Sequence, residues 1–243
     1  MLSDRAGLDP ALALHRFVSA EELDAQLAAD VARALAGTIE ARGSAVLAVS
    51  GGRTPAAMFA RLAQAPLQWN RISVTLVDDR WLPADHADSN ARLVRQHLLQ
   101  GPAAAARWVG LVGEGGHAAT GLASSRAVLA SLSQPFDVVL LGMGNDGHTA
   151  SLFPCAAETA AALDPDCPDR LAVVHPASAP YERISLTLPV LAAARNLWLH
   201  LTGDEKWQVL VNALASNPPN LPIARVFAAA RGDKRVYWSP AHA

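Results

Sequence analysis

Short apolar runs, each followed by a polar or glycine-rich loop and then by a helix-like segment, recur along this sequence. Three of them span residues 45–49, 72–77 and 137–142. Continuous apolar runs of this length are typical of strands buried on both faces of a parallel sheet. Alternation of such strands with helices is typical of α/β proteins. The sequence therefore predicts an α/β fold, with a single three-layer α/β/α domain over residues 1–243 and a doubly wound, mostly parallel sheet.

The other expected elements continue this rhythm. Ser19, followed by Glu22 three positions later, predicts the capped start of a helix that runs to about residue 41, and Gly43 predicts its end. Further helices are expected from Pro55 onward and over residues 89–99, 118–132 and 204–214. The additional strands are expected at residues 13–17, 108–112, 171–175, 184–188, 196–202, 226–229 and 235–238, with a loop over 154–169.

Charge and composition restrict the partners. The chain has 20 Lys and Arg against 22 Asp and Glu, a formal net charge of −2, so no overall field attracts nucleic acid or an anionic membrane. No apolar run approaches the ~20 residues of a membrane span, and the N-terminus does not resemble a signal peptide. We expect a cytoplasmic protein in which Cys155 and Cys167 are free thiols. A disulfide across the loop between them is the alternative.

Four loops are expected to form the ligand site, because doubly wound sheets bind ligands beyond the carboxyl ends of their strands. These loops follow residues 49, 77, 142 and 202. The first joins a strand to a helix start, where unpaired N–H groups and the helix dipole favour an anion such as phosphate. A tight turn with Pro55 as helix starter explains the same segment equally well. The candidate phosphate-binding residues here are Gly51, Gly52, Arg53 and Thr54.

The second loop begins with two adjacent carboxylates, Asp78 and Asp79, and continues with Arg80. Helix capping explains the later residues of this loop, and a surface salt bridge with Arg80 explains Asp79. Neither explains Asp78. We expect Asp78 to orient a base or a sugar hydroxyl, and Arg80 to stabilise negative charge that develops in a reaction.

The third loop carries the candidate base, His148. It lies in a polar, glycine-rich turn beyond a buried strand, and Asp146 two positions earlier can fix its tautomer. The glycines of this loop also match the GxGxxG spacing of dinucleotide-binding folds. Pro154 follows too soon for the long helix of that motif, so we do not expect a nicotinamide cofactor.

Two more cations stand at the ends of predicted elements. Arg183 precedes the expected strand at 184–188, and Lys206 follows the expected strand at 196–202. Each can be a site residue or simply a solvated surface charge.

Five segments, taken together and in this order, resemble the 6-phosphogluconolactonase family, whose fold is shared with glucosamine-6-phosphate deaminases. They are SGGRTP, VDDRWLPADHADSN, FDVVLLGMGNDGHTASLFP, RISLTLPVL and LTGDEKWQVL. The resemblance implies an α/β/α sheet. It also implies hydrolysis of 6-phospho-D-glucono-1,5-lactone to 6-phospho-D-gluconate in the oxidative pentose phosphate pathway, without a metal or other cofactor.

The resemblance also implies roles for single residues. By position, His148 is the base that activates water, with Asp146 beside it, and catalysis further involves Asp78 and Arg80. Ser50 and Ser151 lack the strand-to-helix context of a nucleophile, so direct hydrolysis is expected. The substrate and its phosphate are expected to contact Gly51, Gly52, Thr54, Asn90, Gly144, Arg183 and Lys206, together with Arg53, whose position is expected to vary in the family.

Two other functions remain open at this point. Glucosamine-6-phosphate deaminases carry a Glu five residues after the His, where this chain has Phe153, so their proton relay is incomplete here. A sugar-phosphate sensor is the second alternative. Such a regulator normally brings a DNA-binding module, and the sequence shows no helix-turn-helix extension.

Overall fold

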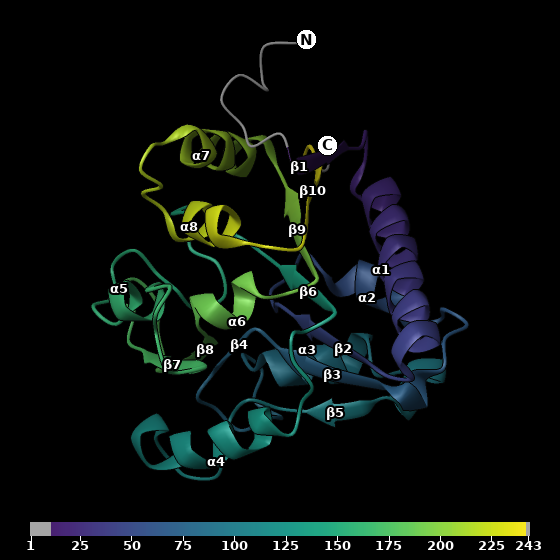
Figure 1. Ribbon diagram of the computed structural model, residues 1–243, viewed down its shortest axis with the longest axis horizontal. Helices are drawn as coiled ribbons and strands as arrows, with labels where there is room; N and C mark the ends of the chain where they lie inside the picture. Colours follow the sequence, from purple (N-terminus) through teal and green to yellow (C-terminus); the bar gives the residue numbers. More distant parts are fainter. Residues whose placement is uncertain (1–10, 242–243) are drawn as a thin grey trace.

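A seven-stranded sheet runs through the middle of the computed structural model, which describes residues 11–241 (Figure 1). All six neighbouring strand pairs are parallel, which confirms the expected α/β class and the mostly parallel sheet. In spatial order the strands are β1 (Leu12–Arg16), β10 (Asp233–Ser239), β9 (Asn196–Thr202), β6 (Val138–Leu141), β2 (Ala45–Val49), β3 (Ile72–Leu76) and β5 (Arg107–Val109).

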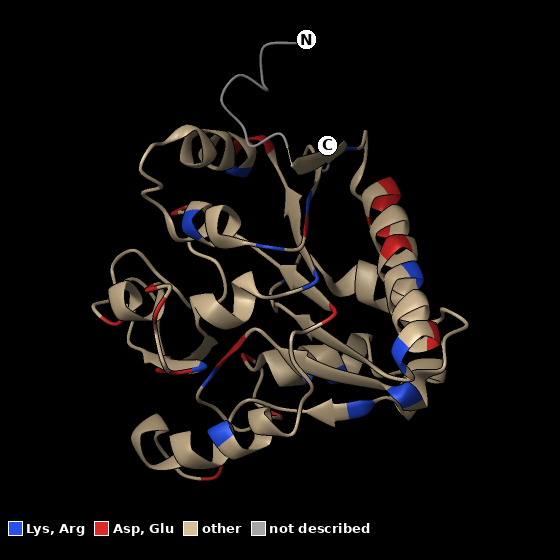
Figure 2. Ribbon diagram, in the orientation of Figure 1, with Lys and Arg blue, Asp and Glu red and all other residues tan. Residues whose placement is uncertain are grey.

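The central strands are the apolar runs that stand out in the sequence. Every residue of β2 and β6 is buried, and β2, β3 and β6 carry no charged residue (Figure 2). Such strands can lie only in the interior of a sheet covered on both faces. From β2 the chain proceeds to β3 and β5 on one side, and β6 leads to β9 and β10 on the other. The loops after β2 and β6 therefore diverge, which opens a crevice at the carboxyl ends of these two strands.

Helices cover both faces of this sheet (Figure 1). One layer contains α1 (Ala20–Arg42), α2 (Ala56–Ala63) and α3 (Asn90–His97), and the other contains α6 (Leu188–Ala192), α7 (Asp204–Ala215) and α8 (Pro222–Ala229). The predicted caps of α1 are confirmed: the Ser19 hydroxyl accepts a hydrogen bond from Glu22 N at 3.2 Å, and Gly43 ends the helix with φ 82°.

A second, antiparallel sheet was not expected. It contains β4 (Asp78–Arg80), β8 (Arg183–Leu186) and β7 (Leu171–Val174), in that order. Residues near 171–175 and 184–188 are strands as predicted, but they belong to this sheet. The segment Asp78–Arg80 was expected to be a loop. The two sheets share one hydrophobic core, and α4 (Ala118–Ala130) packs against β7.

Three further differences from the sequence-based expectation concern local structure. Residues 226–229 were expected to form a strand and lie instead in α8, because Pro222 starts a helix that buries Ile223, Val226 and Phe227 on one face. The expected loop over 154–169 contains the short helix α5 (Thr159–Ala162). Two segments for which no helix was expected, η2 (Trp69–Arg71) and η3 (Gly101–Ala105), are 3₁₀ helices.

The described part of the chain contains no helix that is both long and apolar enough to cross a membrane. Cys155 and Cys167 are free thiols, as expected. What the sequence suggested about the first ten residues lies outside the described range.

Candidate active site

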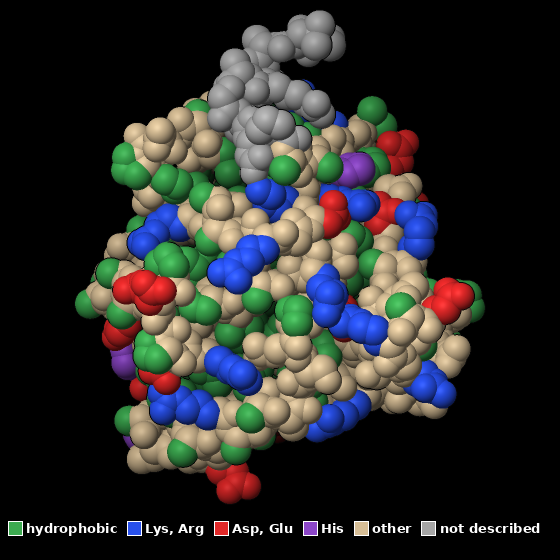
Figure 3. All heavy atoms as spheres, viewed as in Figure 1, with side chains coloured by type: hydrophobic (Ala, Val, Ile, Leu, Met, Phe, Trp, Pro, Cys, Tyr) green, Lys and Arg blue, Asp and Glu red, His purple; other side chains and the backbone are tan. Residues whose placement is uncertain are grey.

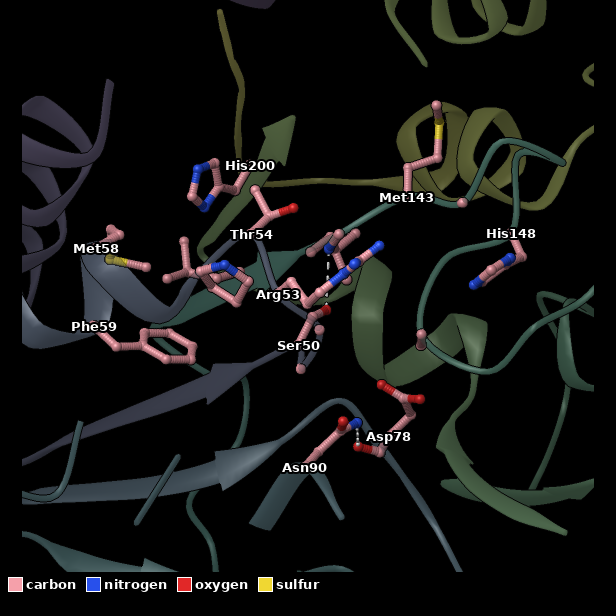
Figure 4. Close-up of a pocket in the computed structure, with 18 of the residues that line it drawn as sticks. Ser50, Arg53, Thr54, Met58, Phe59, Asp78, Asn90, Met143, His148 and His200 are labelled. Atoms are coloured by element: carbon pink, nitrogen blue, oxygen red, sulfur yellow. Dashed lines mark hydrogen bonds between the residues drawn. The ribbon is translucent and has the colours of Figure 1, made fainter. Parts of the chain in front are cut away.

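A cavity of about 490 Å³ opens where the segments that follow β2, β3, β6 and β9 meet. The expected convergence of these four loops is therefore confirmed. Figure 4 shows His148 and Asp78 on one side of the cavity and His200 on the other, with Arg53 and Thr54 between them. All sequence-predicted site residues except Asp146 line it: Gly51, Gly52, Arg53, Thr54, Asp78, Arg80, Asn90, Gly144, His148, Arg183 and Lys206.

Asp146 is not among the residues that line the cavity, but it contacts the candidate base. Its Oδ1 atom is 2.5 Å from Nδ1 of His148 and also accepts a hydrogen bond from the His148 backbone N–H at 3.2 Å. An ionised carboxylate only accepts hydrogen bonds, so Nδ1 of a neutral His148 carries the proton and Nε2 keeps its lone pair. The half-buried imidazole is thus arranged as a proton acceptor.

The ring of His148 is held in place from two sides. The Phe153 ring stacks on it, with centroids 3.9 Å apart and planes inclined by 23°. On the other side the chain passes so close at Gly144 that an added Cβ would lie 2.3 Å from the ring. Glycine is therefore required at this position for steric reasons.

The loop after β2 is fixed to its neighbours by hydrogen bonds and close contacts. The Ser50 hydroxyl accepts a hydrogen bond from Gly142 N at 3.0 Å, which joins the loops after β2 and β6. An added Cβ at Gly51 would lie 1.9 Å from Oδ1 of Asn90, so only glycine fits there. Gly52 has φ 98°, a conformation that favours glycine. The segment therefore brings bare backbone to the cavity just before α2.

Asp78 and Asp79 have different environments, because adjacent residues of a strand point to opposite sides. Asp78 lines the cavity, and its Oδ2 accepts a hydrogen bond from the Ser151 hydroxyl at 2.6 Å. Its backbone carbonyl accepts one from the Asn90 side chain at 2.9 Å. The Asp78 carboxylate is therefore held rigidly while one edge faces the ligand space.

Asp79 instead caps α3. It accepts hydrogen bonds from the backbone N–H groups of Asn90 at 2.7 Å and Ala91 at 3.1 Å, and from the Ser89 hydroxyl at 3.2 Å. Burial raises the pKa of Asp79 to about 6, although these hydrogen bonds oppose the shift. The surface salt bridge considered for Asp79 and Arg80 is wrong. Asp79 is 1% exposed, and the group of Arg80 that donates to its carboxylate is the backbone N–H.

Two arginines lie opposite each other at the cavity edge, since Arg80 of β4 pairs in register with Arg183 of β8. Arg183 is 7% exposed, and its guanidinium lies 5.0 Å from the centre of the Phe153 ring, so it is not a solvated surface charge. Burial lowers the pKa of Arg183, and the neighbouring Arg80 lowers it further. The Nε atoms of both residues are buried and have no hydrogen-bond partner within residues 11–241.

Lys206 and Arg53 add positive charge to the same cavity. Neither forms a hydrogen bond or an ion pair with a residue that the structure describes. Burial lowers the pKa of the half-buried Lys206, and Arg53 lowers it further. Arg53 is exposed and Lys206 is half-buried, and like charges that line one cavity repel each other. This arrangement therefore suits a ligand that carries negative charge.

Sequence reasoning missed three residues that shape the site. Ser151 holds Asp78, Phe153 stacks on the base, and His200 lines the cavity. The first two belong to the same loop as His148, which was a usable signal. His200 lies inside β9, where a single histidine gave no sign of its exposure to the cavity.

Comparisons with known proteins show the family of the chain. The family model described as glucosamine-6-phosphate isomerases/6-phosphogluconolactonase matches residues 18–238. A 6-phosphogluconolactonase of Mesorhizobium japonicum is 45% identical over 224 residues, which cover 92% of this chain and 94% of that protein. One from Pseudomonas putida is 41% identical over 234 residues, covering 96% of this chain and 95% of that protein.

Solved structures show the same relationship. A 6-phosphogluconolactonase from Shewanella baltica superimposes with a TM-score of 0.90 at 38% identity, over 96% of this chain and 100% of the other. A monomeric glucosamine-6-phosphate deaminase shares the fold, with a TM-score of 0.73 at 19% identity over 93% of this chain and 97% of the other. The chain thus belongs to the glucosamine-6-phosphate isomerase/6-phosphogluconolactonase family.

Proposed function

We propose that this chain hydrolyses 6-phospho-D-glucono-1,5-lactone to 6-phospho-D-gluconate in the oxidative pentose phosphate pathway, with His148 activating water and no metal taking part. The pairing of Asp146 with His148 at the edge of a cation-lined cavity carries this proposal. The 6-phosphogluconolactonases that resemble this chain over nearly its full length support the choice of substrate.

In the first step, Nε2 of His148 takes a proton from water as the water oxygen attacks the lactone carbonyl carbon. Asp146 accepts a hydrogen bond from Nδ1–H and stabilises the imidazolium that forms. The carbonyl oxygen becomes an oxyanion. Arg80, at the rim of the same cavity, is positioned to donate to it.

In the second step, the tetrahedral intermediate collapses and the bond between the carbonyl carbon and the ring oxygen breaks. The imidazolium returns its proton to the ring oxygen, which leaves as a hydroxyl group on the same molecule. The new carboxylic acid loses its proton to solvent. We assign the fixed Asp78 carboxylate to a sugar hydroxyl, because its Ser151 hydrogen bond holds it in one orientation.

The phosphate end of the substrate is assigned to the loop before α2 and to the cations Arg183 and Lys206. A glycine-rich helix start offers backbone N–H groups to a phosphate. Arg183 has a buried Nε without a hydrogen-bond partner, and Lys206 forms no hydrogen bond or ion pair within the described chain. Arg53, Asn90 and Gly144 also line this space and complete the proposed binding set.

Deamination of an amino-sugar phosphate is the less favoured reaction of this family. Phe153, which stacks on His148, occupies the position where the sequence resemblance expects a deaminase to carry Glu. A phenyl ring cannot relay a proton. The His148 imidazole next to it then transfers one proton in each step, which is sufficient for hydrolysis.

The metal-free form of the mechanism is supported by the donor set. Among the described residues no group of three or more His, Cys, Asp and Glu side chains could hold a metal ion. Added chelator should leave the rate unchanged. Activity that disappears with chelator and returns with zinc would overturn this part of the proposal.

The proposal also covers the chain as a whole. We place it in the cytoplasm as one lactonase domain over residues 1–243, acting on a small phosphorylated lactone without a cofactor, a nucleic acid or a membrane. The free Cys155 and Cys167 support a reducing compartment. The Lys and Arg side chains on the face drawn in Figure 3 are scattered, with no continuous basic patch.

One assay tests the function directly. Hydrolysis of 6-phosphogluconolactone and of unphosphorylated gluconolactone is followed with the same enzyme sample, with spontaneous hydrolysis subtracted. We expect acceleration of both, with a much higher kcat/KM for the phosphorylated lactone. No acceleration above the spontaneous rate, or equal kcat/KM for both lactones, would contradict the proposal.

A further inference from the structure

The cavity contains a second imidazole, His200, at the end away from His148 (Figure 4). His200 lies in β9, two residues before the strand ends at Thr202. It is 6% exposed and lines the cavity. The mechanism proposed above uses none of its atoms.

Both ring nitrogens of His200 are buried without a hydrogen-bond partner within residues 11–241. Asp24 of α1 lies beside the ring: its Oδ1 is 3.2 Å from Nε2 and is itself without a hydrogen bond within the described chain. A buried polar group that lacks a partner lowers stability. His200 lies at the wall of the cavity with Asp24 beside it, and this arrangement indicates that a ligand completes the environment of the imidazole.

A second buried aspartate on α1 shows what a purely structural carboxylate looks like in this protein. Asp30 accepts hydrogen bonds from the Tyr237 hydroxyl at 2.8 Å, Gln26 at 3.0 Å and Arg33 at 2.6 Å. The bond from Tyr237 ties α1 to β10, and the other two lie within α1. Asp24 makes no hydrogen bond of this kind within the described chain, and its neighbour is the imidazole that faces the cavity.

The surroundings of His200 fit an anion. Thr54 and Lys206 line the same cavity, and the apolar side chains of Met58 and Phe59 form part of its wall. Apolar walls exclude water and strengthen a charge-assisted hydrogen bond. Since Nε2 is next to Asp24, Nδ1 is the ring nitrogen left for a ligand.

We propose that His200 is a phosphate-binding residue at the inner end of the cavity, oriented by Asp24 at Nε2 and donating from Nδ1 to a phosphate oxygen. Asp24 supplies the counter-charge for an imidazolium and is a positioning residue. The identity of the ligand as a sugar phosphate rests on the proposed function. The presence of an anion site at His200 does not.

The test compares three variants in two measurements. His200→Asn keeps a side-chain N–H near the Nδ1 position but removes the charge, and Asp24→Asn keeps the shape of the orienting group. His15→Asn is the matched control. His15 is also an imidazole with a buried, unpartnered Nε2, and it lies in the same row of the sheet, two strands away from His200 through Tyr237.

The first measurement is the Kd of sulfate by calorimetry, because sulfate imitates phosphate and does not change its charge near neutral pH. We expect His200→Asn to weaken sulfate binding about 10–100-fold, as for the loss of one charge-assisted hydrogen bond. Asp24→Asn should weaken it in the same direction by a smaller factor, and His15→Asn should leave it unchanged. Circular dichroism and Tm confirm that each variant is folded.

The second measurement is kcat and KM for both lactones. His200→Asn should raise KM for the phosphorylated lactone and leave kcat/KM for the unphosphorylated lactone unchanged. Unchanged sulfate binding in folded His200→Asn, or equal losses on both lactones, would overturn the assignment. A wild-type chain that binds sulfate through His200 but hydrolyses neither lactone would refute the proposed function alone.

Discussion

The two ends of the seven-stranded sheet differ in how completely their buried charged groups are partnered. At the amino end, Asp137 immediately before β6 is 3% exposed and fully partnered. Its carboxylate contacts the guanidinium of Arg42, lies 3.4 Å from Nε of Arg195 and accepts the Val46 N–H at 2.8 Å. At the carboxyl end, the buried Nε atoms of Arg80 and Arg183 have no hydrogen-bond partner in the described chain, although each guanidinium donates to a backbone carbonyl through another nitrogen.

This difference distinguishes charged residues that hold the fold together from charged residues that are available to a ligand. A neutralised buried charge connects elements, here α1, β2 and β6, and leaves nothing for a ligand to satisfy. At the carboxyl end, four cations (Arg53, Arg80, Arg183 and Lys206) share the cavity with one carboxylate, Asp78, and this excess of positive charge reduces stability unless another molecule supplies negative charge. The experiments below test whether the two ends differ as this comparison requires.

The largest effect should come from the carboxyl end. His148→Ala removes the proton acceptor and should lower kcat for the phosphorylated lactone by about 10²–10⁴-fold, with the fold and sulfate binding intact. Stopped assays with spontaneous hydrolysis subtracted measure the loss. Asp146→Asn should lower kcat by a smaller factor, because the imidazolium loses its ionised partner. Turnover near that of the wild type in His148→Ala would remove His148 from the mechanism.

The next effect belongs to the amino end and concerns stability. Asp137→Ala leaves the Val46 N–H unpartnered and separates two arginines from their carboxylate. The free energy of unfolding should fall by roughly 2–4 kcal/mol, less than for a fully buried pair, because Arg42 and Arg195 keep contact with solvent. Urea titration measures it. The folded fraction should keep the wild-type kcat/KM, and a specific loss of catalysis would blur the distinction between the two ends.

The two sheets also differ in how well the sequence predicts their strands. The apolar runs of β2, β3 and β6 predicted the sheet and the meeting of their loops, because buried parallel strands leave a continuous apolar signal. The strand β4 left no such signal. Its residues, Asp78–Arg80, are all charged and pair with β8 through backbone atoms, so a pattern of side chains cannot reveal it.

Contacts within the candidate site were predictable where both residues lie in one loop. His148 and Asp146 are two positions apart, so their contact follows from local geometry. The pairing of Arg80 with Arg183 joins positions that are far apart in the sequence, and the approach of Asp24 to His200 joins α1 with β9. Such contacts depend on how layers pack, which a single sequence does not encode in any local pattern.

A smaller effect tests two cations that line the cavity, Arg183 and Lys206. Arg183→Ala or Lys206→Ala should lower kcat/KM for the phosphorylated lactone about 10–100-fold, since each removes one charge-assisted hydrogen bond to the phosphate. Hydrolysis of the unphosphorylated lactone should not change. Arg195→Ala, at the amino end, is the matched control and should affect neither substrate. Equal kcat/KM in all three variants would make the cavity cations structural.

The smallest effect concerns His175, which lies outside both ends of the main sheet. Its Nδ1 is 2.8 Å from Oε1 of Glu158, and its Nε2 is 3.1 Å from Oε1 of Glu182. Glu182 also accepts the Ala118 N–H at 2.9 Å, so the cluster connects the antiparallel sheet to the start of α4. The hydrogen bond with Glu158 raises the pKa of His175, burial opposes this, and Glu182 raises the pKa further.

A raised pKa means that the folded chain holds the His175 proton more tightly than the unfolded chain does. The stabilisation is therefore complete below the ordinary histidine pKa of about 6.5 and is lost as pH rises through the higher pKa of the folded state. His175 is 58% exposed, so solvent screening should keep the effect below about 1 kcal/mol. The Tm difference between wild type and His175→Gln should be largest near pH 5.5–6 and disappear at alkaline pH. A difference that grows with pH would reverse the sign and show that the two glutamates do not stabilise the charged imidazole.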